Sequence, residues 1–168
     1  NADSAEIYGV EFEGLKGLDF ASRWVGDWVN GFYVAGNLTL SDSEIEITPG
    51  PGVGNITNQR RRLTQHSEWV ANLQLGYDSP GGSHGATLAY NSFGERILFA
   101  GIDGFGDAFE QPFHSLDFTY SWFATDQLTL KFRLRNLLKD KLEVEQDGVT
   151  VIEQKVGLTG LFDIRWAL

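Results

Sequence analysis

Residues 68–78 read EWVANLQLGYD, and this stretch decides the fold class because its side chains alternate between two characters. Apolar side chains fall at every second position from Trp69 to Tyr77, whereas the positions between them are polar apart from Val70 and Gly76. Successive side chains of a β-strand point to opposite faces of a sheet. A period of two therefore predicts a strand with one apolar and one polar face.

The same alternation recurs on both sides of this stretch. It is nearly pure in 115–122 (SLDFTYSW) and 128–135 (LTLKFRLR), whereas the 3.6-residue period of an amphipathic helix is hard to find. We expect about seven long antiparallel strands and no helix between them. Their ranges are 5–14, 31–41, 68–78, 86–94, 115–122, 128–135 and 157–168. A shorter hairpin is expected at 141–155, because Asp147-Gly148 suits a tight turn.

The predicted connections alternate in length along the chain. The segments 79–84 and 124–127 are short and 15–30 is moderate, whereas 42–67, 95–113 and 137–156 are long. Short turns on one side and long loops on the other are typical of transmembrane β-barrels, with the long loops outside the cell. The fold class expected is therefore all-β, with antiparallel transmembrane β-barrel strands.

The number of predicted strands suggests a part of a larger barrel. Bacterial single-chain barrels have an even number of strands, and seven is odd. The chain begins at Asn1 and contains no methionine, so we expect a processed product or a fragment.

Composition excludes several classes of function. The chain has 168 residues with 23 acidic and 13 basic side chains, a balance that argues against nucleic acid as a partner. It contains no cysteine, so disulfides and thiolate metal sites are excluded, and no cofactor is expected. No run of about 18 apolar residues is present to form a transmembrane helix.

Several segments, taken in order, resemble barrel strands of TonB-dependent outer-membrane receptors. They are NADSAEIYGVEFEG at 1–14, GNLTLSDSEI at 36–45, NLQLGYDSPGG at 72–82, NSFGERI at 91–97 and FRLRNLLKDK at 132–141. The resemblance covers essentially the whole chain. It implies that residues 1–168 form the C-terminal part of a receptor's barrel domain in the outer membrane of a Gram-negative bacterium.

The resemblance also implies function and partners. Such receptors have a 22-stranded barrel around an N-terminal plug, and they import siderophores, cobalamin or carbohydrates with energy delivered through TonB. The expected partners are outer-membrane lipid, the plug and the upstream strands. The plug and the TonB-contacting segment are not in this sequence, so TonB would act only through the missing N-terminal part. No enzymatic activity is implied.

Two sets of residues are candidate sites. The polar faces of the strands would point into the barrel lumen, where charges could bind plug or ligand or form structural ion pairs. These lumen-facing charges are Glu11, Glu13, Asp117, Lys131, Arg133, Arg135, Asp163 and Arg165. In the glycine-rich outer segment 95–113, the candidate ligand contacts are Asp103, Phe105, Asp107 and Phe109.

Other chemistry has weaker support. The run Arg60, Arg61, Arg62 in a long loop could bind lipopolysaccharide phosphates or be merely solvated. The only histidines are His66, His84 and His114, all outside mid-strand positions, so no catalytic triad is indicated, and no metal-ligand cluster is visible.

Two alternatives remain open. A soluble all-β module, such as a carbohydrate-binding sandwich, would bury the apolar faces against a second sheet. A small outer-membrane barrel, including a barrel enzyme, would pair its first strand with its last.

Overall fold

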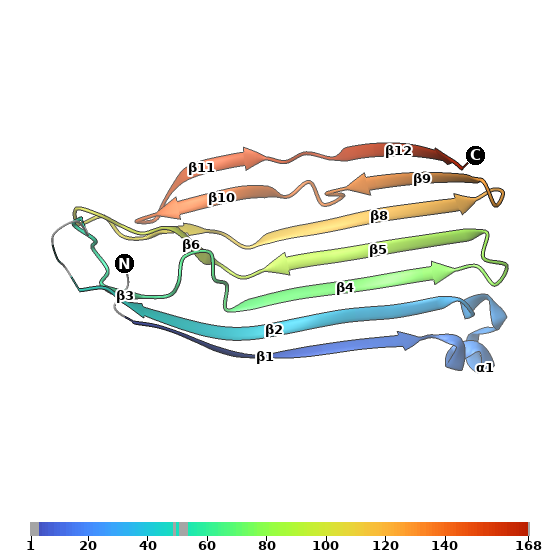
Figure 1. Ribbon diagram of the computed structural model, residues 1–168, viewed down its shortest axis with the longest axis horizontal. Coiled ribbons are helices and arrows are strands. Elements are labelled where there is room, and N and C mark those ends of the chain that lie inside the picture. Colours follow the sequence, from blue (N-terminus) through green and yellow to red (C-terminus); the bar gives the residue numbers. More distant parts are fainter. Residues whose placement is uncertain (1–3, 49, 51–53, 168) are drawn as a thin grey trace.

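The computed structural model describes residues 4–48, 50 and 54–167, and antiparallel β-structure dominates it (Figure 1). Seven long strands are neighbours in the order β1-β2-β4-β5-β8-β9-β12, and the short strand β3 (Arg60–Arg61) adds to β2, making eight. The bounds of the long strands are β1 Ser4–Gly17, β2 Phe32–Glu46, β4 Trp69–Asp78, β5 His84–Phe93, β8 Phe113–Phe123, β9 Leu128–Arg135 and β12 Thr159–Trp166. All of the predicted long strands are confirmed.

The register aligns the apolar positions of neighbouring strands into rows. One row runs across the sheet from Val34 to Leu75, Leu88, Phe118 and Leu134, each directly opposite the next. A shift of one residue in any pairing would move a strand's apolar side chains to the polar face. The consistent register therefore produces one apolar and one polar face over the whole sheet.

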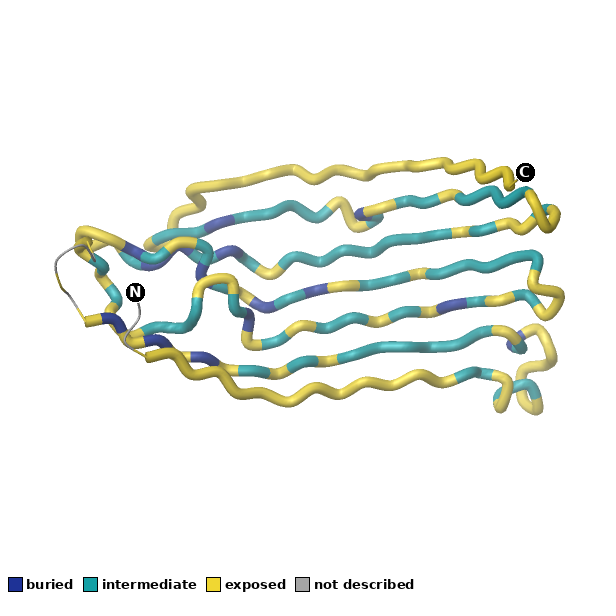
Figure 2. The backbone as a smooth tube through the Cα atoms, in the orientation of Figure 1, coloured by how far each residue is buried: buried dark blue, intermediate teal, exposed yellow. Residues whose placement is uncertain are grey.

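The long strands form a single layer. Figure 2 shows them as one broad sheet with exposed edges, and within the described residues each long strand makes its main contacts with its sheet neighbours. On the apolar face, Leu73 and Phe162 keep 55% and 62% of their surface exposed. The buried apolar residues lie elsewhere, all but Val29 towards the long loops. They are Val29, Ile45, Ile47, Ile97, Ala108 and Val144.

A second sheet is built from the long loops. It has four strands in the order β11 (Val149–Lys155), β10 (Lys141–Gln146), β7 (Ala108–Glu110) and β6 (Arg96–Phe99). The hairpin predicted at 141–155 is confirmed, and its turn at Asp147 and Gly148 has positive φ angles of 50° and 78°. The hairpin is extended by two further strands, because the segment 95–113, predicted as a loop, supplies β6 and β7.

The short connections lie together at the opposite end of the long strands from the long loops (Figure 1). The prediction that no helix occurs in them is wrong for the segment between β1 and β2. It contains η1 (Asp19–Ala21), α1 (Ser22–Val25) and η2 (Asp27–Val29). Phe20, Trp24 and Trp28 recur every four residues there, which is a helical spacing that the strand pattern concealed.

The sheet is open in this chain. The edge strands β1 and β12 do not pair with each other, so the two antiparallel sheets do not close into a barrel. Neighbouring strands of an antiparallel sheet run in opposite directions. The first and the seventh strand of the path, β1 and β12, therefore run in the same direction. Among the described residues, no helix has the length and apolar character needed to cross a membrane.

Candidate functional site

The polar face of the sheet carries all of the predicted lumen-facing charges. Pairing of Glu11 with Thr39, Asp117 with Ala89, and Lys131 with Asp163 puts them on the face opposite the apolar rows. Glu13, Arg133, Arg135 and Arg165 share this face, because each lies two residues from one of these charges or from another member of the set. The predicted sharing of one face is confirmed, whereas their contact with plug or ligand stays a prediction.

Uncharged amides occupy the middle of this face. Asn37, Asn72 and Asn91 form a row, and the Nδ2 of Asn72 donates to the Oδ1 of Asn37 at 2.7 Å. Nearby, the Nε2 of Gln74 donates to the hydroxyl of Tyr33 at 3.2 Å. A shallow hollow of about 210 Å³ lies over this row. Its lining offers the amide groups of Asn37, Asn72, Gln74 and Asn91 together with the carboxylate of Glu13 at the β1 side.

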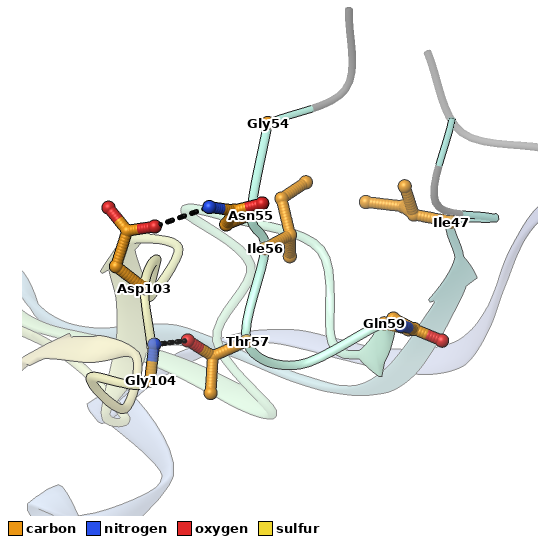
Figure 3. A pocket seen from close by; sticks show the side chains of 8 residues that line it. All are labelled: Ile47, Gly54, Asn55, Ile56, Thr57, Gln59, Asp103 and Gly104. Atoms are coloured by element: carbon orange, nitrogen blue, oxygen red, sulfur yellow. Dashed lines mark hydrogen bonds between the residues drawn. The ribbon is translucent and has the colours of Figure 1, made fainter. Parts of the chain in front are cut away.

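The long loops enclose the largest hollow near the predicted ligand contacts. It has a volume of about 650 Å³ and is lined by Ile47, Gly54, Asn55, Ile56, Thr57, Gln59, Asp103 and Gly104 (Figure 3). The Nδ2 of Asn55 donates to the Oδ1 of Asp103 at 2.8 Å, and the backbone N–H of Gly104 donates to the Oγ1 of Thr57 at 3.1 Å. These bonds hold the segments 54–59 and 101–106 together although they are far apart in the sequence.

The predicted ligand contacts divide into exposed and internal residues. Asp103 and Phe105 are exposed, with 61% of Phe105 accessible, whereas Asp107 is only 5% exposed. The carboxylate of Asp107 accepts from the backbone N–H of Gly101 at 2.7 Å and from the Nδ2 of Asn58 at 2.9 Å. Asp107 therefore holds together the segments 54–59 and 101–107, which we call the loop cluster. The alternation of residue types did not reveal this structural role.

A second hollow lies between the loop cluster and the β10–β11 hairpin. It has a volume of about 350 Å³, and Phe109 lines it together with Glu95, Asp107, Glu145 and Asp147. The carboxylate of Asp147 accepts from the backbone N–H of Gly106 at 3.2 Å, so the hairpin turn contacts the glycine-rich loop directly. The sequence did not predict that the hairpin contributes to this region.

Most arginines of the run 60–62 form ion pairs with acidic residues of the same chain. Arg60 pairs with Glu44 at 2.7 Å, and Arg62 pairs with Glu68 at 3.0 Å. The hydrogen bond and the negative charge of Glu44 raise the pKa of Arg60. Two of the three arginines considered for phosphate binding therefore already have an acidic partner.

The histidines lie apart from one another and contact hydroxyl groups. His66 bridges Ser41 and Ser43 at 2.9 and 2.7 Å, His84 bonds Tyr120 at 2.8 Å, and His114 bonds Tyr90 at 2.7 Å. In the part of the chain that the structure describes, no carboxylate hydrogen-bonds any of the three rings, and no group of three acidic or histidine side chains is placed to hold a metal ion. Ser43 is 3% exposed, so its hydroxyl is not accessible to a substrate.

Comparisons of the chain with protein-family models, with curated proteins and with solved structures returned no match.

Proposed function

We propose that this chain forms part of the wall of an outer-membrane receptor of the TonB-dependent type, which takes up a siderophore, cobalamin or carbohydrate-type ligand. The observation that carries the proposal is a continuous apolar face on a single-layer sheet of long antiparallel strands. The plug domain and the remaining strands would come from the rest of the receptor.

The exposure of this face favours lipid over water. Leu75, Phe132 and Ile164 expose 40%, 37% and 65% of their surfaces on the same face. Soluble monomers rarely expose contiguous apolar patches of more than a few hundred Å². In the hydrocarbon of a bilayer the same side chains meet an apolar solvent.

The size of the apolar face also fits a membrane. On β4 it extends from Trp69 to Tyr77, which is about 27 Å at roughly 3.4 Å per residue. A strand tilt of about 40° reduces this to about 21 Å along the membrane normal, close to the apolar band of about 25 Å in outer-membrane barrels.

Aromatic rings cluster at the short-turn end of the apolar face. The ring of Phe32 lies 4.6 Å from that of Tyr77 and 5.9 Å from that of Trp28, and the His84 ring stacks at 6.2 Å on Trp122. Amphipathic rings favour the headgroup level of a membrane, where they form girdles. This clustering supports an arrangement with the short turns at one membrane surface and the long loops at the other.

The sandwich alternative needs a second sheet over the apolar face. The four-stranded sheet is formed by the long loops and extends from one end of the main sheet, so it does not supply that cover (Figure 1). A small closed barrel needs β1 paired with β12, yet these strands run in the same direction and occupy opposite edges.

Single cysteines on adjacent residues test the proposal, because the native chain has none. The full chain, folded into phospholipid vesicles, would carry either Leu73→Cys on the apolar face or Asn72→Cys on the polar face. We expect a charged, membrane-impermeant thiol reagent to label Asn72→Cys and to leave Leu73→Cys protected. Rapid labelling of Leu73→Cys, with 55% of the native side chain exposed in the isolated chain, would contradict a lipid-facing surface.

A further inference from the structure

The polar face is charged with opposite signs at its two edges. Glu11 and Glu13 lie on β1, whereas Lys131 and Arg133 lie on β9 and Arg165 on β12. The amide row separates the two groups. A chain with a net charge of −10 therefore carries a concentrated basic patch at one edge.

This basic patch surrounds a hollow near the turn between β8 and β9. The hollow has a volume of about 730 Å³, and its polar lining comes from Ser121, Thr129, Lys131, Arg133, Asp163 and Arg165. Three cations and one carboxylate give the lining a formal charge of +2. The side chains come from three adjacent strands, so the sheet holds them at constant spacing.

The single carboxylate does not neutralise the patch. Asp163 is directly opposite Lys131 in the register, yet its Oδ2 contacts the Nη2 of Arg133, diagonally across the strands, at 2.6 Å. Within residues 4–48, 50 and 54–167, Lys131 and Arg165 have no acidic partner. Two of the three cations are thus available to an external anion.

Arg133 also has an unused donor. Its Nε is buried from solvent and has no hydrogen-bond partner among the described residues, although Asp163 occupies the Nη2 group. A buried donor without a partner costs free energy. The guanidinium is thus oriented by Asp163 while one of its N–H groups remains unsatisfied.

We propose that this basic patch binds an extended acidic polypeptide segment that lies along β9. Side chains at i and i+2 of a strand are about 7 Å apart on one face, which is the spacing of Lys131 and Arg133. Arg133 can bind a second carboxylate while it holds Asp163, because Asp163 accepts from its Nη2 and a guanidinium has five N–H donors. An extended partner with carboxylates at alternate positions repeats that distance, so successive carboxylates reach successive cations. Ser121 and Thr129 add hydroxyl groups beside them.

The test uses the full chain in detergent micelles and a fluorescein-labelled peptide, Thr-Glu-Thr-Glu-Thr-Glu-Thr, followed by fluorescence anisotropy. An isomeric peptide with the three glutamates adjacent has the same charge and the wrong spacing. We expect the alternating peptide to bind tighter than the isomer, and the Lys131→Gln/Arg165→Gln variant to weaken its binding about tenfold, since each replaced cation removes a charge-assisted hydrogen bond. The Arg60→Gln/Lys155→Gln variant removes the same charge elsewhere and should bind like the native chain.

Three results would overturn the proposal: equal binding of the two peptides, native affinity in the Lys131→Gln/Arg165→Gln variant, or displacement of the peptide by phosphate or succinate at the peptide's own concentration. The last would indicate a site for small oxyanions. The inference does not depend on a membrane location. If the chain proves soluble, the same peptide-binding experiment in buffer without detergent tests the basic patch. The cysteine labelling described above tests separately whether the chain forms part of a barrel wall.

Discussion

Arginine in place of Leu73 would put a charge at the centre of the apolar face. Leu73 lies midway between Trp69 and Tyr77 on β4, opposite Gly36 on β2 and Tyr90 on β5, and 55% of its surface is exposed in the chain alone. No neighbouring element can shield the new side chain. If the face contacts hydrocarbon, the substitution lowers the free energy of unfolding by about 2 to 4 kcal/mol, the cost of Arg at the midplane of an outer-membrane barrel.

If the face contacts water instead, Leu73→Arg should change the free energy of unfolding much less. A substitution at a half-exposed surface position, away from any cap or buried network, changes stability by about 0.5 kcal/mol or less. Gln74→Arg is the matched control, because Gln74 is the next residue on the same strand and faces the polar side between Ala35 and Ala89. We expect this control to stay within about 1 kcal/mol of the native chain, since one neutral hydrogen bond to Tyr33 is at stake.

Urea unfolding in phospholipid vesicles measures the difference. Tryptophan fluorescence would report the transition, and the native chain, Leu73→Arg and Gln74→Arg should have similar slopes, so that the midpoints give the change in free energy. Equal midpoints for the two arginine variants would refute a lipid-facing apolar surface. Cooperative folding of the native chain in buffer without lipid or detergent would refute it as well.

Three further substitutions test the polar face, the loops and the hairpin. Gly76→Ala should destabilise the sheet by about 1 to 3 kcal/mol in the same unfolding assay, because the new Cβ would overlap the ring of Tyr33. Asp107→Ala should loosen the loop cluster and speed its proteolysis without changing the long strands, because two donors lose their buried acceptor. Lys141 lowers the pKa of Glu153, and hydrogen bonds to Glu143 and to Glu153 raise the pKa of Lys141. Their pairing should therefore protect the hairpin amides from hydrogen exchange above the ordinary carboxyl pKa of 4.5. This protection should be lost as the pH falls through the lowered pKa of Glu153. In Glu153→Gln the pH dependence in acid should disappear.

The pKa of Lys141 is shifted in the opposite direction from that of Glu153, so its contribution to stability is lost at high pH. A raised pKa means that the pairing contributes below the ordinary lysine value of 10.5 and is lost only as the pH rises through the raised value. Both side chains keep 41% of their surface exposed, so the effect of the pair should be local and should weaken with salt. Hydrogen exchange of β11 that is independent of pH between acid and neutral conditions, after correction for intrinsic rates, would contradict this role.

The candidate site shows the limit of residue patterns. Asp103 and Asp107 look alike in the sequence AGIDGFGDAF at residues 100–109, and both were predicted ligand contacts. The structure separates them, because Asp107 is buried against Gly101 and Asn58, whereas Asp103 stays at the surface. Burial of a loop residue depends on which distant segment packs against it, so it cannot be predicted from the local alternation of polar and apolar residues.

What the sequence determined by itself is the division of the long strands into two faces. A period of two assigns each side chain to a face, and adjacent strands joined by short turns must align these faces to keep apolar side chains together. The seven strand positions and the common face of Lys131, Arg133 and Asp163 follow from this local rule. The turn at Asp147 and Gly148 follows from another local preference, that of the Asp-Gly dipeptide for tight turns.

Only the tertiary structure decided which loops meet. The pairing of β7 with β10 joins residues that are more than thirty positions apart, and Asn55 reaches Asp103 over a similar separation. It was also the structure that showed Asp163 bonding Arg133 rather than Lys131, its partner in the register. Such choices depend on the packing and hydrogen bonds of segments distant in sequence, whereas alternation along one strand reports only which side of the sheet a residue faces.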